Sequence, residues 1–214
     1  MPVITGISPT KRSPNRCRIA LDGTFAFACN VNVVARFRLR VGQALSAEQV
    51  CEIEQGEVRQ ETFDAATRLI ASRLHSTAEL RRKLLRKDFA ASLVDDVIAD
   101  LTRMGYLDDG QFAKAKASSA ARYKQHGKRR AKTELLRAGV SGEVADAALE
   151  QVYDASDTLA VARELTRKQL PRLKKLDPAV ARRRLMGMLQ RRGFEYDEIK
   201  QVVDPVLAEE REDG

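Results

Sequence analysis

An apolar pattern recurs three times along this chain, at intervals of about fifty residues. Residues 84–89 (LLRKDF) align with residues 135–140 (LLRAGV), and again with residues 189–194 (LQRRGF), without a gap. The apolar residues around this segment keep the same register in each copy. They are Leu80, Ala131 and Leu185, then Val94, Ala145 and Ile199, then Ile98, Leu149 and Val203. Such a chain is expected to stack its copies as an array of repeats.

Each copy is predicted to contain three helices. In the first copy, one helical face carries Phe63, Ala66, Leu69 and Ile70. Ser76, followed three residues later by Glu79, matches a capping box and opens the second helix. The third helix carries Val94, Val97, Ile98 and Leu101, and Gly105 is expected to end it. The third copy, which is reached through Pro171, is the most diverged.

The first part of the chain follows a different pattern. Two β-type runs, residues 17–21 and 24–28, flank the pair Asp22-Gly23, which is a strong signal for a hairpin turn. Ser46, with Gln49 after it, predicts a short helix. We therefore expect a mainly α fold with four parts. They are an N-terminal β-hairpin extension with a short helix at 1–58 and three-helix repeats at 59–107, 108–155 and 156–214.

Charge is separated within each copy. The chain has a net charge of +8 and a pI of about 9.6, which favours an anionic partner. The second helices are basic, with Arg81, Arg82, Lys83, Arg86 and Lys87; Lys128, Arg129, Arg130, Lys132 and Arg137; and Arg182, Arg183, Arg184, Arg191 and Arg192. The third helices are acidic or mixed, with Asp95, Asp96 and Asp100; Glu143, Asp146 and Glu150; and Glu195, Asp197 and Glu198.

Two interpretations of the basic helices stay open. They are either solvated faces joined by local ion pairs of little energy, or a stripe that binds an acidic groove or a phosphate backbone. Glu134 is a candidate local partner for Lys128 or Arg130. Under the second interpretation the anion-binding residues are Arg81, Arg82, Lys83, Lys128, Arg129, Arg130 and Lys132.

Residues 105–113 form the densest local motif. Gly105 ends one helix, and Asp108 or Asp109 is expected to cap the next. Tyr106, Leu107 and Phe112 are predicted to wedge two repeats together. The structural interpretation of the motif is therefore that it joins the first repeat to the second.

An enzymatic interpretation would make Asp108 and Asp109 a Mg²⁺-dependent nuclease pair. Adjacent aspartates project in different directions, however, and no further ligand motif lies near them in the sequence. The chain also lacks the P-loop, GxSxG and HExxH motifs. We expect no catalytic residues, no metal and no cofactor. The cysteines, Cys17, Cys29 and Cys51, lack CxxC spacing and are expected to be packing residues in a reducing compartment.

A three-helix unit also suggests helix-turn-helix binding to a DNA operator. The recognition helix would then be the third helix of a copy, which carries aspartates such as Asp95 and Asp96. Aspartates repel phosphates, and they are not the Arg, Asn or Gln side chains that read bases. Sequence-specific operator binding is therefore disfavoured.

Several of these segments resemble the RecX family. Residues 105–109 (GYLDD) with Phe112-Ala113 resemble its most characteristic segment, and residues 127–130 (GKRR) resemble the next. Further matching residues are Glu134-Leu135, Gly139-Val140, Arg73, Ser76, Glu79-Leu80 and Leu84, and at the front Arg18, Leu21-Asp22-Gly23 and Phe25-Ala26-Phe27. The resemblance covers essentially the whole chain. The third repeat departs from it at Met186-Gly187-Met188 and at Pro171.

The resemblance implies tandem three-helix repeats in an elongated, curved array. It also implies a non-enzymatic regulator that binds RecA filaments on DNA and restrains RecA's ATP hydrolysis and strand exchange in recombination and repair. Single- or double-stranded DNA is a further candidate partner, and the rival interpretation is a general DNA-binding architectural protein. We expect a cytoplasmic location, because the N-terminus lacks an apolar signal region and no run is long enough to span a bilayer. We also expect a monomer.

Overall fold

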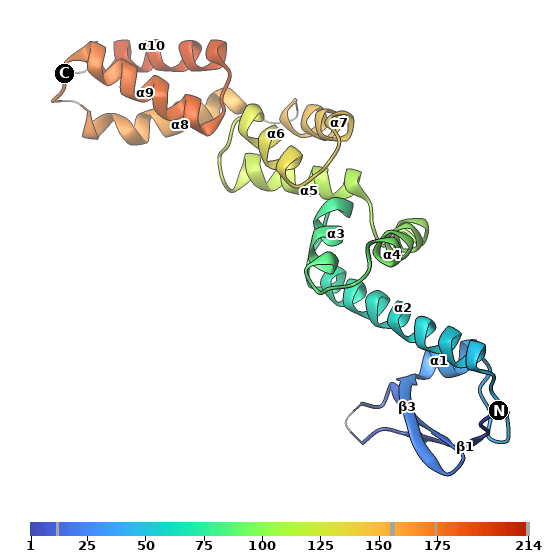
Figure 1. Cartoon of the computed structure of the whole chain (residues 1–214). Coiled ribbons are helices and arrows are strands. Elements are labelled where there is room, and N and C mark those ends of the chain that lie inside the picture. Colours follow the sequence, from blue (N-terminus) through green and yellow to red (C-terminus); the bar gives the residue numbers. More distant parts are fainter. Residues whose placement is uncertain (12, 155–156, 174, 213–214) are drawn as a thin grey trace. The chain divides into compact units, whose positions relative to one another are not determined.

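The computed structural model describes residues 1–11, 13–154, 157–173 and 175–212 (Figure 1). The chain forms two compact units. The first contains Met1–Arg73 and Arg81–Met104, and the second contains Leu74–Leu80 and Gly105–Gly214. The predicted boundary at 155/156 lies outside the described residues.

The first unit opens with an antiparallel sheet of order β1-β2-β3. The strands are β1 (Ile4–Pro9), β2 (Arg16–Leu21) and β3 (Thr24–Asn30). The predicted hairpin is confirmed, because β2 pairs with β3 around Asp22 and Gly23, which both have positive φ angles. One face of the sheet is buried, with a core of Ile4, Cys17, Ile19, Cys29, Val33, Leu39, Leu45 and Ile53.

Two helices cover that buried face of the sheet, α1 (Val31–Arg36) and the start of α2 (Ala47–Ser72) (Figure 1). Ser46 and Gln49 form the expected capping box. The prediction of a short helix is wrong, since α2 runs for 26 residues. Gly56 lies inside α2 and leaves room for the ring of Phe37, since a Cβ at position 56 would lie 2.6 Å from the ring carbon Cε2. The predicted boundary at 58 therefore falls inside a continuous helix.

The remaining helices follow the predicted triplets. The first copy continues with α3 (Thr77–Leu85) and α4 (Ala91–Arg103), and Gly105 follows α4 with a positive φ of 77°. The second copy contains α5 (Asp109–Arg122), α6 (Lys128–Arg137) and α7 (Gly142–Tyr153). The third contains α8 (Thr158–Gln169), the short 3₁₀ helix η1 (Leu170–Arg172) that includes Pro171, α9 (Pro178–Arg192) and α10 (Tyr196–Glu212).

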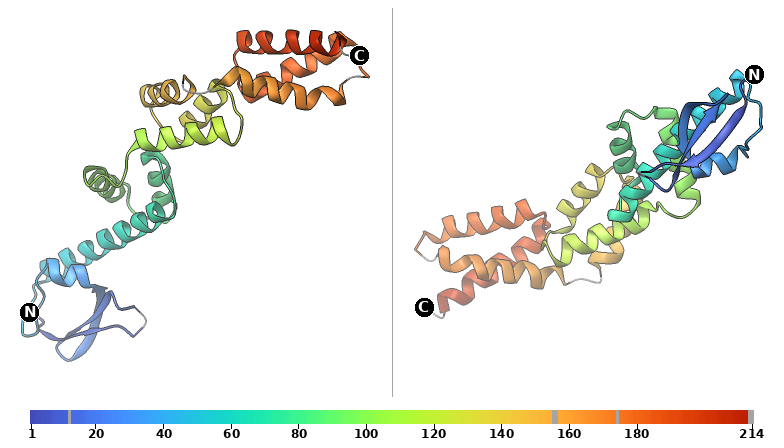
Figure 2. Two further views of the ribbon diagram at one scale, coloured as in Figure 1. Left: turned by 180° about the vertical axis from the view of Figure 1, so that it is seen from behind. Right: turned by 90° about the horizontal axis from the view of Figure 1, so that it is seen from below.

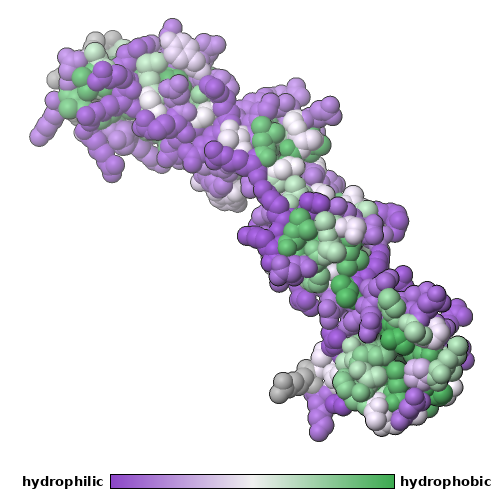
Figure 3. Space-filling view, viewed as in Figure 1, coloured by the Kyte–Doolittle hydropathy of each residue, from purple (hydrophilic) through white to green (hydrophobic). Residues whose placement is uncertain are grey.

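The second and third copies each have their own apolar core. In the second copy, small residues of α5 pack against α6 and α7, and the central side chains are Phe112, Ala113, Ala117, Leu135, Ala145 and Leu149. The third copy's core includes Leu185, Leu189, Phe194, Ile199, Val202 and Val203, from helices that lie side by side in Figure 2. Polar side chains cover most of the visible surface of these helices (Figure 3).

The second helix of every copy ends in the same turn. Asp88, Gly139 and Gly193 occupy equivalent positions, and their φ angles are 63°, 85° and 86°. Each donates its backbone N–H to the carbonyl three residues earlier, at 3.1, 2.9 and 3.0 Å. The repeat register read from the sequence therefore extends to backbone conformation.

The turns at Gly139 and Gly193 form head-to-tail joints between second helices. At one joint the first turn of α3 meets the end of α6, where the Ser76 hydroxyl donates to the Ala138 carbonyl at 2.6 Å. At the other, the first turn of α6 meets the end of α9. There the N–H groups of Gly127 and Arg129 donate to the carbonyls of Arg192 and Gly193, at 2.8 and 3.1 Å.

Glycine permits both joints. A Cβ on Gly139 would collide with that of Ala78, and a Cβ on Gly193 would lie 2.5 Å from the Cβ of Arg130 and closer still to its backbone nitrogen. Ser76 and Gly127 lie 51 positions apart, which is the offset between the first two copies. The two joints are therefore repeats of one arrangement.

Gly193→Ala is expected to lower the free energy of unfolding by about 2–5 kcal/mol, because it adds backbone overlap to left-handed strain. Gly105→Ala is the matched control, since Gly105 also has a positive φ but a Cβ there would meet nothing within 4 Å. The control should lose only about 1–2 kcal/mol. Urea unfolding of both variants checks this, and equal losses would show that the joint tolerates a side chain.

Candidate functional site

The basic side chains of the second helices differ in their partners. In the first copy, the guanidinium of Arg81 binds both carboxylate oxygens of Asp95, at 2.6 and 3.1 Å. In the second copy, Lys132 binds Asp146 at 2.6 Å. The pairs are equivalent, since each residue lies 51 positions after its counterpart. They tie a second helix to a third helix, so local pairing explains these two candidate residues.

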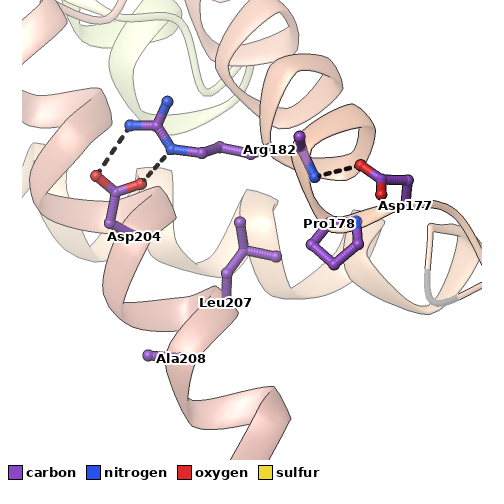
Figure 4. A pocket seen from close by; sticks show the side chains of 7 residues that line it. Asp177, Pro178, Arg182, Asp204, Leu207 and Ala208 are labelled. Carbon is purple, nitrogen blue, oxygen red and sulfur yellow. Dashed lines mark hydrogen bonds and ion pairs between the residues drawn. The ribbon is translucent and has the colours of Figure 1, made fainter.

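The third copy has a similar pair, one turn earlier on the second helix and one turn later on the third. Arg182 of α9 binds Asp204 of α10 at 2.7 and 3.1 Å. This pair stands beside a surface hollow of about 490 Å³ (Figure 4). Asp177 also lines the hollow, and it caps α9 by accepting from the N–H groups of Ala179 and Val180. Both carboxylates of the hollow therefore have structural roles.

These ion pairs shift the titration of their members. The hydrogen bond from Arg81 lowers the pKa of Asp95 below its ordinary value, and that from Arg182 lowers the pKa of Asp204. All four side chains are largely exposed, so each pair stabilises the fold only slightly.

Glu134 is the charged centre of the second copy. It accepts a hydrogen bond from Lys124 at 2.8 Å and lies 3.1 Å from the His126 ring and 3.8 Å from Arg130. Burial opposes its ionisation, but the hydrogen bond from Lys124 lowers its pKa overall. For His126, burial disfavours the protonated form and lowers its pKa, and the positive charge of Arg130 lowers it further. The predicted pairing of Glu134 with Arg130 is present, whereas Lys128 is not among its partners.

Arg130 also belongs to the joint between α6 and α9. Its guanidinium donates to the carbonyl of Arg191 at 3.2 Å. In return, Arg192 donates to the carbonyl of Lys124 at 3.2 Å. Arg130 therefore has a structural role in addition to its charge.

Lys128 and Arg129 differ from the other candidates. Both side chains are exposed in the first turn of α6, and neither has an ion pair within the part of the chain that the structure describes. The joint brings this turn against the end of α9, which carries Arg191 and Arg192. Cationic side chains from two copies therefore gather around one helix junction.

The remaining candidates lie in the first unit. Arg82 is exposed and Lys83 is half-buried, both on α3. That all three basic helices form one stripe stays a prediction, as does the elongated, curved array.

The motif at residues 105–113 is only partly as predicted. Asp108 caps α5, accepting from the N–H groups of Gly110 and Gln111 at 2.8 and 3.0 Å. Asp109 instead accepts from the N–H of Thr77, in the first turn of α3, at 2.7 Å. Both aspartates therefore satisfy helix N-termini.

The predicted aromatic wedge is wrong. Tyr106 is 60% exposed, and Phe112 packs inside the core of the second copy. Leu107 is buried as expected. The motif contacts the start of α3 through Asp109, a polar contact that the apolar pattern did not reveal. Ser76 was predicted only as a cap, and its hydrogen bond to Ala138 was missed for the same reason.

The cysteines are free thiols. Cys17 and Cys29 face one another across β2 and β3 and are buried in the sheet's core. Burial raises the pKa of Cys29 to about 11, so it stays protonated and serves as a packing residue. Cys51 is exposed, which corrects its prediction as a packing residue. Within the described residues, no helix is both long and apolar enough to cross a membrane.

Comparisons with known proteins match every part of the chain. The model of the regulatory protein RecX N-terminal domain matches residues 2–46. The models of the first, second and third RecX three-helix domains match residues 63–101, 108–149 and 156–203. The regulatory protein RecX of Bacillus subtilis (strain 168) is 30% identical over 213 residues, which cover 100% of this chain and 80% of that protein.

Further relatives agree. The regulatory protein RecX of Bacillus licheniformis is 31% identical over 217 residues, covering 100% of this chain and 81% of that protein. A crystal structure of regulatory protein RecX has a TM-score of 0.82 at 20% identity, covering 95% of this chain and 100% of that one. RecX from Lactobacillus salivarius has a TM-score of 0.65 at 19% identity, covering 70% and 97%. At this level of identity, the two structural similarities show that the fold is shared.

The contacts of the 105–113 motif predict an order of stabilities. Tyr106→Ala removes a mostly exposed ring, so the free energy of unfolding should change by less than about 0.5 kcal/mol. Asp109→Ala leaves the N–H of Thr77 without its acceptor and should cost about 0.5–2 kcal/mol. Denaturant unfolding of both variants measures the order, and a larger loss for Tyr106→Ala would mean that the ring is packed in solution.

Proposed function

The chain belongs to the RecX family, and on that premise we propose that it binds RecA filaments assembled on DNA and restrains RecA's ATP hydrolysis and strand exchange. The protein acts by occupancy: it binds along the filament and changes filament growth or disassembly. In this proposal it carries out no reaction itself, and the carboxylates of its densest motif cap helices. Family membership supports RecA as the partner. In the proposal, exposed basic side chains bind the acidic groups of the filament.

One observation carries the choice of surface. Lys128 and Arg129 are exposed and have no ion pair within the described residues, beside a joint that also holds Arg191 and Arg192. Cations without local partners can exchange bound counterions for an acidic surface at little cost. The paired residues Arg81 and Lys132 would first have to leave their aspartates.

A general DNA-binding architectural protein is the alternative, since phosphates would bind the same cations. Retention on immobilised single-stranded DNA, with and without RecA and ATP, separates the two. A RecA regulator should be retained far better when RecA and ATP are present. Equal retention on bare DNA would favour the alternative.

The protein should lower the DNA-dependent ATPase rate of RecA in proportion to filament occupancy. Steady-state ATP hydrolysis by RecA on single-stranded DNA, measured against increasing amounts of this protein, checks the expectation. The protein alone should hydrolyse no ATP. An unchanged RecA rate at saturating excess would refute the proposed function.

Cations with and without an ion pair should contribute differently to the binding of RecA filaments. The double variant Lys128→Gln/Arg129→Gln should fold with a stability change of less than about 0.5 kcal/mol per site. It should inhibit RecA only at higher concentration, and the slope of log affinity against log salt should fall by about two. Titration into RecA filaments at several salt concentrations measures both quantities.

Lys132→Gln/Arg167→Gln is the matched control, because it also removes one lysine and one arginine. These two cations are paired, with Asp146 and Glu209 respectively. The control should melt slightly earlier and inhibit nearly as well as the wild type. Identical inhibition curves for both double variants would exclude the start of α6 as the binding surface.

A further inference from the structure

A second cationic feature lies on the third copy, away from the ion pair of Arg182. A hollow of about 450 Å³ opens between the end of α8 with η1 and the side of α9. It is lined by Gln169, Leu173, Arg183, Arg184, Met188 and Arg191. Small-molecule sites have volumes of this order. Half of its lining side chains are arginines, and none of its lining residues is a carboxylate.

The structure gives these arginines no carboxylate partner among the residues it describes. Neither Arg183, Arg184 nor Arg191 has an ion pair to a carboxylate within the described ranges of the chain. Arg182, their neighbour on α9, is bound to Asp204 on α10 and does not line this hollow. Helix α9 therefore carries one arginine that is paired with a carboxylate, outside the hollow. The three arginines that line the hollow have no such partner among the described residues.

The absence of a side chain at Gly187 explains how Arg191 reaches the hollow. A Cβ on Gly187 would lie 3.3 Å from the Nη1 atom of Arg191. The guanidinium of Arg191 therefore extends back along α9 across the turn that precedes it, which is the turn that follows Arg183 and Arg184. The Met186-Gly187-Met188 segment therefore affects the hollow, because a methyl group at position 187 would press against the guanidinium of Arg191.

Like charges gathered without a counter-ion repel one another, and an anion in the hollow would relieve that repulsion. Guanidinium groups offer planar pairs of N–H donors that match the oxygens of phosphate. Gln169 adds an amide, and Leu173 and Met188 add apolar surface beside the cations. The set suits a phosphate group attached to a larger, partly apolar molecule.

We propose that this hollow is a binding site for a phosphate group, carried either by a nucleotide or by a nucleic-acid backbone. The site does not rest on filament binding. It is made by α8, η1 and α9 within the third copy, and it needs no residue of the joint except Arg191.

The test uses the full chain and sodium pyrophosphate, measured by calorimetric titration at low ionic strength and by thermal unfolding. Pyrophosphate should bind with about one equivalent and raise the melting temperature beyond the effect of sodium chloride at equal ionic strength. Arg183→Gln and Arg191→Gln should each weaken binding by about tenfold, which is typical for the loss of a hydrogen bond to a charged group. Their melting temperatures without pyrophosphate should not fall.

Arg182→Gln is the matched control, from the same helix and with the same change of charge. It should keep the wild-type affinity for pyrophosphate and lower the melting temperature slightly, since it leaves Asp204 unpaired. Gly187→Ala changes no charge but places a methyl group against Arg191, so it should weaken binding while raising helix stability. No binding beyond the salt effect, or equal weakening in Arg182→Gln and Arg191→Gln, would overturn the proposal.

Competition identifies the source of the phosphate. Magnesium-free ATP that displaces pyrophosphate at lower concentration than an oligo(dT) strand would indicate a nucleotide, and the reverse order would indicate a nucleic-acid backbone. Either order supports the site. Displacement by poly-glutamate as readily as by both phosphate ligands would overturn it, since the hollow would then be a general contact for carboxylates. Because RecA is absent from these measurements, their failure would leave the proposed function untouched.

Discussion

Hydrogen bonds from the start of one second helix to the last carbonyls of another are the constraint on which both joints depend. Every helix leaves N–H groups unsatisfied at its start and carbonyls at its end. Gly127, the N-cap of α6, has no side chain to satisfy them, and the carbonyls of Arg192 and Gly193 accept instead. The positive end of one helix dipole also meets the negative end of another.

The repeat register was predictable from the sequence because it depends on apolar side chains and turn residues. Gly139 and Gly193 align with Asp88, and the three share one backbone conformation, as their alignment implies. The length of α2 was not predictable in the same way. Its start depends on a local signal, the capping box at Ser46, whereas the glycine inside it at position 56 is explained by the ring of Phe37, nineteen positions earlier in the chain. Local patterns do not report such distant contacts.

The candidate site shows the same limit. Basic composition identified the second helices, but Lys128 and Lys132 look alike in the sequence, and only the position of Asp146 distinguishes them. Tyr106 failed as a predicted core residue for a related reason. Here Tyr106 is exposed, and the contact between its segment and α3 is the polar one of Asp109 with Thr77.

The joint between α6 and α9 is built largely from main-chain atoms and from the absence of side chains at Gly127 and Gly193. Main-chain hydrogen bonds persist when neighbouring side chains change. Lys128 and Arg129 can therefore be exchanged for other residues while the stack of helices stays intact. The fold separates the scaffold from the side chains that it displays, so the charge of this surface can be changed without rebuilding the joint.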